Sequence, residues 1–191
     1  MKTTISDWRE FVFHEHNVVC NQKYDGMPYS RHLKYTEKQG LRFLYEYDNI
    51  FSEYEKDIIK LSLPAHDLME DARMTYNNIS NVLQQMLYHN MALGSEGDTH
   101  KMADSVADII YCVTDEKGRN RKERKNDKYY EELKQNRLAV FVKLADIAAN
   151  RMYSKLSGST MYNKYVNEFP NVEKQLFREE FKEFFEYIKN I

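Results

Sequence analysis

A group of potential metal ligands follows an apolar stretch in the middle of the chain. His66 and Asp67 come shortly after Leu63, and the pair Glu70-Asp71 follows three residues later. If the segment is helical, His66 and Glu70 lie one turn apart on one face, and Asp67 and Asp71 do the same. Three carboxylates beside apolar residues repel one another unless a cation compensates them, and a divalent metal ion does so. A helix end with a solvated acidic face is the alternative, which the pattern alone favours.

A second candidate is the segment 138–149, which is apolar on nearly every side, as is typical of a buried helix. Lys143, Asp146 and Asn150 interrupt it as one stripe at helical spacing. A buried stripe that contains a carboxylate needs a partner. Asp146 as a metal ligand, with Asn150 one turn further toward a substrate, would explain the stripe. The wet face of an amphipathic helix explains it equally well.

The third candidate is His32, at the start of a helix expected after the loop 21–28. A lone histidine is more often structural than a ligand. With His66, Asp67 and Asp146, however, it completes a set of two imidazoles and two carboxylates. Such a set, which lacks a thiolate, suits Mn²⁺, Fe²⁺ or Zn²⁺ rather than a structural zinc site.

A basic run occupies residues 117–128. A solvated surface is its usual meaning, and we favour it. An electrostatic funnel for an anionic substrate such as a phosphate is the functional alternative. An RNA-binding patch is the weakest reading, because Glu123 and Asp127 dilute the charge. The cations of the run are Lys117, Arg119, Arg121, Lys122, Arg124, Lys125 and Lys128.

Composition limits the classes of protein to consider. The chain has 191 residues, with 28 Lys+Arg against 30 Asp+Glu, so a general nucleic-acid binder is disfavoured. Its length fits one domain over 1–191, and 15 Tyr, 10 Phe and 1 Trp can fill a core. No apolar run approaches the roughly 18 residues of a membrane span, and residues 1–15 do not resemble a secretory signal. Two cysteines make no disulfide framework, so we expect a cytoplasmic protein without membrane association.

Helical spacing dominates the chain, and glycine and proline are scarce, so the sequence predicts an all-α fold, a single helical bundle. We expect helices over 4–20 with Ser6 as N-cap, 29–47, 52–71 with a kink or break at Pro64, 75–89, a helix capped by Thr99 and ending at 113, 138–156 and 171–188. The loops are expected at 21–28 and 94–98, with a break at 157–159.

Four segments together resemble a known family. KYDGMPYSRH at 23–32, HDLMED at 66–71, VTDEK at 113–117 with ERK at 123–125, and VKLADIAAN at 142–150 occur in the order of the HD-domain metal phosphohydrolases. Within that family, the combination is similar to the (p)ppGpp hydrolase domain of the Rel/Spo stringent-response enzymes. In size the chain is closest to the stand-alone small alarmone hydrolases of the metazoan SpoT homologue type. The resemblance covers about 23–153 and implies an HD-type helical bundle.

The resemblance also implies an activity and a division of roles. The reaction would be removal of the 3′-pyrophosphate of (p)ppGpp to give GDP or GTP and pyrophosphate. Glu70 and Asp71 would position and activate the attacking water. Lys23 would pack on the guanine base, and Asn150 would contact the nucleotide; we group Lys143 with them as a substrate-binding residue. The ligands of one Mn²⁺ would be His32, His66, Asp67 and Asp146.

The chain departs from the family pattern mainly where substrate would be held. Ala72 replaces the usual threonine, Ile147 replaces a basic residue, and Arg151 follows Asn150 directly rather than two positions later. The identity of the nucleotide therefore stays open. The alternatives are another HD phosphohydrolase, such as a 5′-nucleotidase or a hydrolase of a related purine alarmone, and a catalytically silent nucleotide-binding helical protein.

Overall fold

A computed structural model of the chain describes residues 2–90, 96–115 and 126–191. Helices make up 78% of the structure and there is almost no strand in this part, which confirms the predicted all-α fold class. The elements in chain order are α1 Lys2–His14, the π-helical turn η1 Glu15–Val19, β1 Lys23–Tyr24, β2 Met27–Pro28, α2 Ser30–Glu46, α3 Glu53–Ala65, α4 Tyr76–Asn90, α5 Glu96–Val113, α7 Asp127–Gln135, α8 Arg137–Leu156, α9 Met161–Leu176, the 3₁₀ turn η2 Glu179–Phe181 and α10 Lys182–Asn190.

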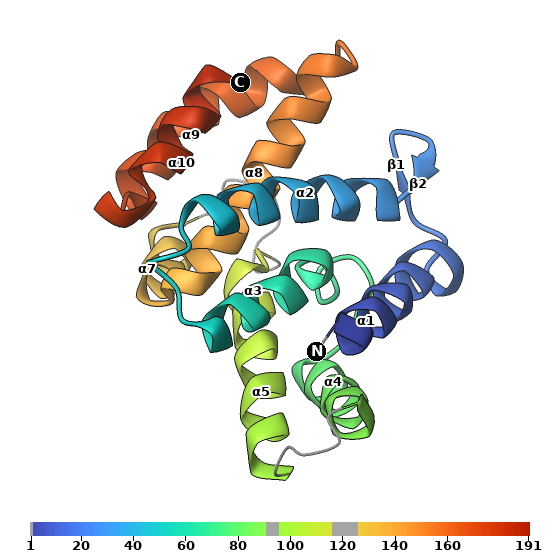
Figure 1. The fold of residues 1–191 in the computed structure, drawn as a ribbon. Coiled ribbons are helices and arrows are strands. Elements are labelled where there is room, and N and C mark those ends of the chain that lie inside the picture. The colour runs from blue at the N-terminus through green and yellow to red at the C-terminus, as the bar shows by residue number, and fades with distance from the viewer. Residues whose placement is uncertain (1, 91–95, 116–125) are drawn as a thin grey trace.

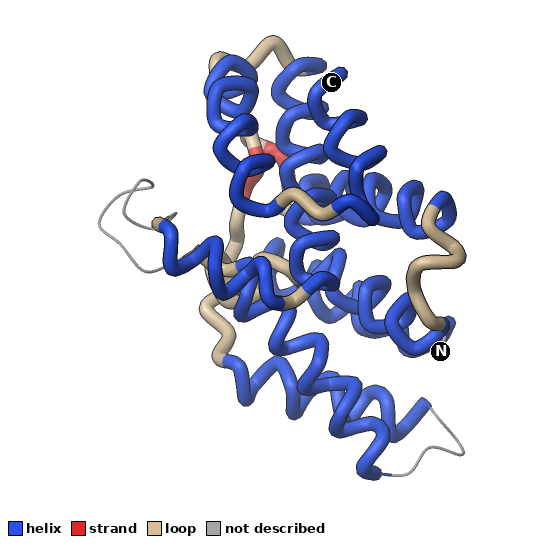
Figure 2. The backbone as a smooth tube through the Cα atoms, turned by 90° about the vertical axis from the view of Figure 1, so that its left-hand side faces the viewer, coloured by secondary structure: helices blue, strands red, loops and turns tan. Residues whose placement is uncertain are grey.

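Three helices from distant parts of the sequence form the centre of the molecule. Helix α2 packs on both α3 and α8, and α3 also contacts α8. Figure 1 shows α4 and α5 at one end of this centre and α9 and α10 at the other. The turned view in Figure 2 keeps the same order along the vertical axis. The elements that carry the predicted ligands are therefore the ones that meet in the middle.

The close packing of α2 on α3 depends on a glycine. A Cβ atom built on Gly40 would lie 2.3 Å from Cδ2 of the fully buried Leu63. Glycine costs about 1 kcal/mol relative to alanine inside a helix, but here it allows the two backbones to approach. His32 lies two turns before Gly40, and His66 lies three residues after Leu63. This close approach therefore fixes the distance between the two histidines.

Aromatic packing joins the C-terminal helices to the same core. The rings of Phe43 on α2 and Phe184 on α10 stack with centroids 3.9 Å apart. The Phe184 backbone N–H donates to the Tyr47 hydroxyl over 2.9 Å. At the opposite end of the chain, the Trp8 indole N–H donates to the Leu61 carbonyl over 2.9 Å. Buried apolar residues from Trp8 to Ile191 thus form one continuous cluster.

Several helix boundaries differ from the sequence prediction. Helix α1 begins before Ser6, so Ser6 is not its N-cap. The last part of the predicted helix 4–20 is the separate π-helical turn η1. Helix α5 begins at Glu96, which places Thr99 inside it. The expected loop 21–28 contains a two-residue hairpin, in which Asp25 and Gly26 take the positive φ values of a tight turn.

The C-terminal half also differs in detail. The expected helix 171–188 is two helices, because the backbone is extended at Phe177 and Arg178. The Phe177 ring packs on Phe185 with centroids 5.5 Å apart, so α10 folds back toward α9. Helix α7 was not expected, and most of the predicted basic run lies outside the described residues. No helix in the described ranges is long and apolar enough to cross a membrane.

The predicted helix 52–71 ends early. Ser52 caps α3 in a reciprocal capping box with Glu55, but the helix ends at Ala65, directly after Pro64. Pro64 has no N–H to bond the carbonyl of residue 60, which weakens the last turn of α3. The chain then forms consecutive tight turns, such as the bond of 2.9 Å from the Asp71 N–H to the Asp67 carbonyl. The predicted stacking of these side chains on a regular helix is therefore wrong, although the residues still gather at one place.

Candidate metal centre

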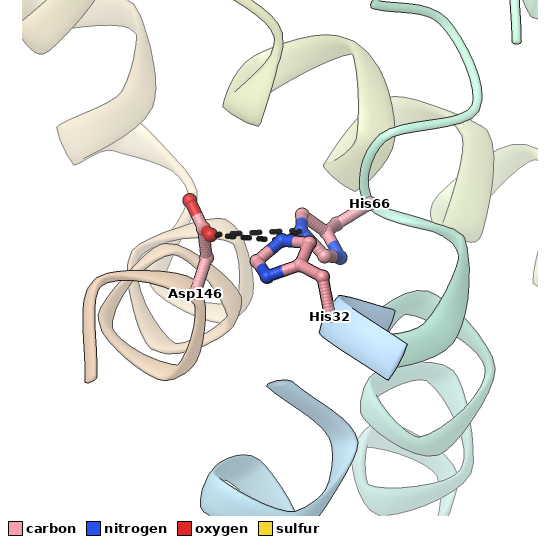
Figure 3. A group of neighbouring side chains, drawn as sticks. All are labelled: His32, His66 and Asp146. Atoms are coloured by element: carbon pink, nitrogen blue, oxygen red, sulfur yellow. Dashed lines mark hydrogen bonds and ion pairs between the residues drawn. The ribbon is translucent and has the colours of Figure 1, made fainter. Parts of the chain in front are cut away.

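The three central helices bring His32, His66 and Asp146 together in the interior. His32 lies in the first turn of α2, His66 directly follows α3, and Asp146 lies in the middle of α8. Figure 3 shows the two imidazoles and the Asp146 carboxylate converging on one point. Their potential ligand atoms all lie within 4.8 Å of one another, and all three residues are buried.

Asp67 completes the predicted set of four. The Nε2 atoms of His32 and His66 are 3.2 Å apart. Oδ1 of Asp146 lies 3.4 and 3.7 Å from these two nitrogens. Oδ2 of Asp67 lies 3.2 and 3.0 Å from them. The structure thus brings together all four residues that the sequence assigned as ligands, although their sequence separations run from 1 to 114 positions (146 − 32).

The orientation of His66 favours metal binding. Nδ1 of His66 lies 2.9 Å from the Leu63 carbonyl oxygen, which can only accept a hydrogen bond. The proton of a neutral His66 is therefore on Nδ1, and the Nε2 lone pair points to the cluster. Nδ1 of His32 is buried and has no hydrogen-bond partner among the described residues.

The two carboxylates of the cluster attract positive charge to the two imidazoles. Burial opposes protonation of His66, but the attraction of the Asp67 and Asp146 carboxylates outweighs it and raises the imidazole pKa to about 10. The pKa of His32 is also raised by these carboxylates against the effect of burial. Burial favours the neutral acids, yet the neighbouring imidazoles and, for Asp146, Lys143 hold both carboxyl pKa values well below the usual range. In the protein alone, protons supply the positive charge that a metal ion would otherwise bring.

The α8 side of the cluster is supported by residues of its own helix. Lys143 is buried, and its Nζ lies 3.0 Å from Oδ2 of Asp146. Asn150 donates from Nδ2 to Oδ1 of Asp146 over 2.5 Å. The Tyr24 hydroxyl in turn donates to Oδ1 of Asn150 over 2.9 Å, and the Tyr24 ring stacks on His32. Lys143 and Asn150 therefore hold Asp146 in place.

The other side is supported by Tyr29, for which the sequence analysis gave no separate role. The Tyr29 hydroxyl donates to Oδ2 of Asp67 over 2.7 Å and also contacts Oδ2 of Asp71. The Gln22 amide donates to the Asp71 carbonyl over 2.7 Å. The sequence gives no signal of this contact, because Tyr29, three positions after Gly26 and three before His32, reaches Asp67 only through the way the hairpin folds back.

Glu70 lies beside a second acidic residue. Burial and the carboxylate of Asp115 raise the pKa of Glu70 to about 7, whereas the charge of Lys143 opposes the rise. The two carboxyl groups are hydrogen bonded, and Asp115 is buried. Glu70 is therefore poised to take up or release a proton near neutral pH.

The remaining predicted residues lie farther from the cluster. Lys23 is exposed on β1, and its side chain makes no hydrogen bond or ion pair with any described residue. Arg151 is buried and donates to the Lys189 carbonyl over 3.0 Å, so it faces the C-terminal helices. Of the basic run, Lys128 lies within the described residues, with Nζ 3.7 Å from a Glu132 carboxylate oxygen.

Comparison with known proteins identifies no relative: no family model, no curated protein and no solved structure matches the chain. What the site does must therefore be argued from its own geometry.

Proposed function

We propose that this protein is a metal-dependent phosphohydrolase that acts on a phosphorylated nucleotide, with the 3′-pyrophosphate of (p)ppGpp as its leading substrate. The observation that carries the proposal is the convergence of two imidazoles and two carboxylates in a buried cluster, with Glu70 and Asp71 beside it. The nucleotide itself is inferred from the resemblance of the sequence motifs.

The residues of the cluster fit a divalent ion. Two nitrogen and two oxygen donors without a thiolate suit Mn²⁺, with Fe²⁺ and Zn²⁺ as alternatives. The structure supports this fit, because the two carboxylates raise the pKa values of both imidazoles, as expected of a site that attracts positive charge. A bound ion would supply Lewis-acid activation of water and of a phosphoryl oxygen. The four residues that would hold it are His32, His66, Asp67 and Asp146.

The surrounding side chains would take up the proton of the attacking water and orient that water. Glu70 accepts a proton from the attacking water, because its pKa of about 7 keeps a large fraction ionised at neutral pH. Asp71, held by Tyr29, orients that water. The water oxygen bonds to the phosphorus that is attached to the 3′ oxygen, and the bond between this phosphorus and the 3′ oxygen breaks. The 3′ oxygen leaves with a proton, which gives pyrophosphate and GDP or GTP.

A related phosphohydrolase is the second candidate. Arg151, which departs from the family pattern, faces α10, and Lys23, which matches the pattern, is exposed, so neither makes a visible contact at the cluster. The base contacts can therefore differ from those of a (p)ppGpp hydrolase, while the metal chemistry stays the same. A 5′-nucleotidase or a hydrolase of a related purine alarmone would fit this description.

The test is pyrophosphate release from ppGpp by metal-stripped protein, with and without added Mn²⁺. We expect Mn²⁺-dependent release, and its loss in Asp67→Ala protein that remains folded by circular dichroism. A panel of 5′-nucleotides and other purine alarmones separates the two candidates. Release that is equal in Asp67→Ala protein would contradict the metal assignment. Protein that binds Mn²⁺ but turns over no member of the panel would instead be a silent nucleotide-binding protein.

A further inference from the structure

The exposed face of α2 carries a row of cations without acidic partners. Arg31, Lys34 and Lys38 are exposed and lie at i, i+3 and i+7, which places them on one stripe. None of the three forms an ion pair with a described carboxylate. Like charges three and four positions apart destabilise a helix. Such a row on a chain of net charge −2 indicates a surface that meets an anion.

The row surrounds a hollow. This hollow is a shallow, open depression of about 250 Å³ over the outer face of α2, and its lining residues are Arg31, Lys34, Tyr35 and Lys38. The Arg31 guanidinium lies 5.6 Å from the centre of the Tyr153 ring, and Nζ of Lys34 lies 5.1 Å from the centre of the Phe13 ring. Stacking on ring faces holds these cations in place without using their N–H donors on an acceptor. The donors stay available for phosphate oxygens.

The hollow is connected to the metal centre by two aromatic rings. The Tyr153 ring packs on Tyr24 with centroids 4.9 Å apart, and Tyr24 stacks on His32 with the same spacing. Tyr35 also packs on Tyr153, with centroids 5.8 Å apart. Tyr24 is hydrogen bonded to Asn150, which holds Asp146. Tyr153 and Tyr24 therefore form a continuous series of packed contacts from Arg31 to His32.

The size of the row selects the kind of anion. From Arg31 to Lys38 the helix makes seven steps of about 1.5 Å each, so the row spans about 10 Å. A chain of two or three phosphates fits that length, and the next cation of the stripe, Arg42, is already paired with Glu46. One helix face therefore suits a small phosphorylated ligand better than a polymer.

We propose that this hollow binds the phosphate chain of the nucleotide that is not cleaved, the 5′-diphosphate or 5′-triphosphate, while the 3′-pyrophosphate lies at the metal centre. This inference rests on the proposed function, because it places the second end of the same substrate. The hollow contributes binding and positions the nucleotide, and it takes no part in breaking the bond.

The test compares a variant that lacks the three positive charges of the hollow with a control variant that lacks three positive charges elsewhere on the surface. Glutamine keeps a long polar side chain with a similar helix propensity. The control cations are exposed, lie on three other helices and form no ion pair with a described residue. The test variant is Arg31→Gln/Lys34→Gln/Lys38→Gln, and the control variant is Lys101→Gln/Lys134→Gln/Lys174→Gln.

Direct binding is the first readout. By calorimetry, GDP should bind the unchanged protein and the control variant alike, and about tenfold more weakly to the test variant, as expected for several exposed ion pairs. Guanosine, which has no phosphate, should bind all three proteins equally. Mn²⁺ affinity should be the same in all three. Equal GDP affinity in the test and control variants would overturn the proposal, even if ppGpp is hydrolysed.

Kinetics provide the second readout. With ppGpp, the test variant should show KM raised about tenfold and kcat unchanged, because the contact is the same in the ground and transition states. With guanosine 3′-diphosphate, which lacks 5′ phosphates, the test variant and unchanged protein should have equal KM. An equal rise of KM for both substrates would contradict the assignment to the 5′ phosphates.

The two proposals can fail separately. If the unchanged protein hydrolyses no nucleotide, and GDP binds the unchanged protein but not the test variant, the proposed reaction fails and the phosphate site stands. If a single-stranded RNA oligonucleotide binds more tightly than GDP and is lost in the same variant, the surface belongs to a nucleic acid, and the inference is overturned.

Discussion

The two sides of the metal centre are built in different ways. On the α8 side, Asp146 receives both of its supporting contacts from its own helix, from Lys143 one turn before and Asn150 one turn after. On the opposite side, Asp67 and Asp71 lie in tight turns, and their support comes from Tyr29, in a distant part of the sequence. One side is positioned by helical regularity and burial, and the other by long-range hydrogen bonds. The two sides should therefore respond differently to mutation.

The largest difference should be in stability. In Asp146→Ala protein, the buried Lys143 loses its ion pair and keeps a long hydrogen bond to the Val113 carbonyl, and removal of one member of a buried pair costs about 3 to 5 kcal/mol. Asp67→Ala should cost less, because the partner imidazoles can lose their protons whereas a buried lysine does so with difficulty. Urea unfolding of the metal-free proteins measures both. Lys143→Met should restore part of the loss in the Asp146→Ala background. An equal cost for the two aspartates would contradict the comparison.

The next effect concerns Tyr29. Tyr29→Phe removes the hydroxyl that Asp67 and Asp71 share, and residues that orient metal ligands typically contribute about 10- to 100-fold to affinity or activity. We expect Mn²⁺ affinity or kcat to fall by at least tenfold, with the fold intact. Isothermal titration with Mn²⁺ and steady-state kinetics separate the two effects. Unchanged values for both would mean that the turns position Asp67 and Asp71 without Tyr29.

The pH profile tests the group beside the cluster. Glu70, which faces Asp115, Lys143 and Asp67, has a pKa of about 7, and as a base it must lose its proton to act. The value of kcat/KM should therefore rise with pH through about 7. Asp115→Asn removes a neighbouring negative charge, which lowers the pKa of Glu70 and moves this rise to lower pH. A rise that stays in place in Asp115→Asn protein, or that persists in Glu70→Gln protein, would assign the proton to another group.

The smallest effect is expected from Tyr24→Phe, the matched change on the α8 side. It removes one hydrogen bond to Asn150, whereas Asn150 keeps its own bond to Asp146 and the ring keeps its stacking on His32. Mn²⁺ affinity should fall by less than in Tyr29→Phe protein under identical conditions. A larger loss in Tyr24→Phe protein would reverse the proposed order of the two sides.

The same contrast explains what the sequence could predict. The stripe of Lys143, Asp146 and Asn150 follows from helical spacing, and the structure confirms the helix that carries it. The gathering of four ligands could be anticipated from residue types, but not from the regular helix expected at 66–71. That helix ends at Ala65, one residue after Pro64, and the turns that follow have no periodic pattern.

The contacts of Tyr29, Tyr24 and Asp115 could not be derived in the same way. Each joins segments that are far apart in the sequence, and each depends on the hairpin or on the end of a helix. Apolar periodicity reports which face of a helix is buried, but not which side chain a loop places opposite it. The hairpin is too short to show strand alternation, so its residues were expected to form a loop.

The most direct test of the central claim is the stoichiometry of Mn²⁺ bound by metal-stripped protein, measured by electron paramagnetic resonance titration. The cluster predicts one Mn²⁺ per chain, lost in Asp146→Asn protein, which keeps the size of the side chain, and retained in Lys23→Ala protein. No bound Mn²⁺, Fe²⁺ or Zn²⁺ in the folded protein, or one ion bound equally well by Asp146→Asn protein, would contradict the metal centre and the function built on it.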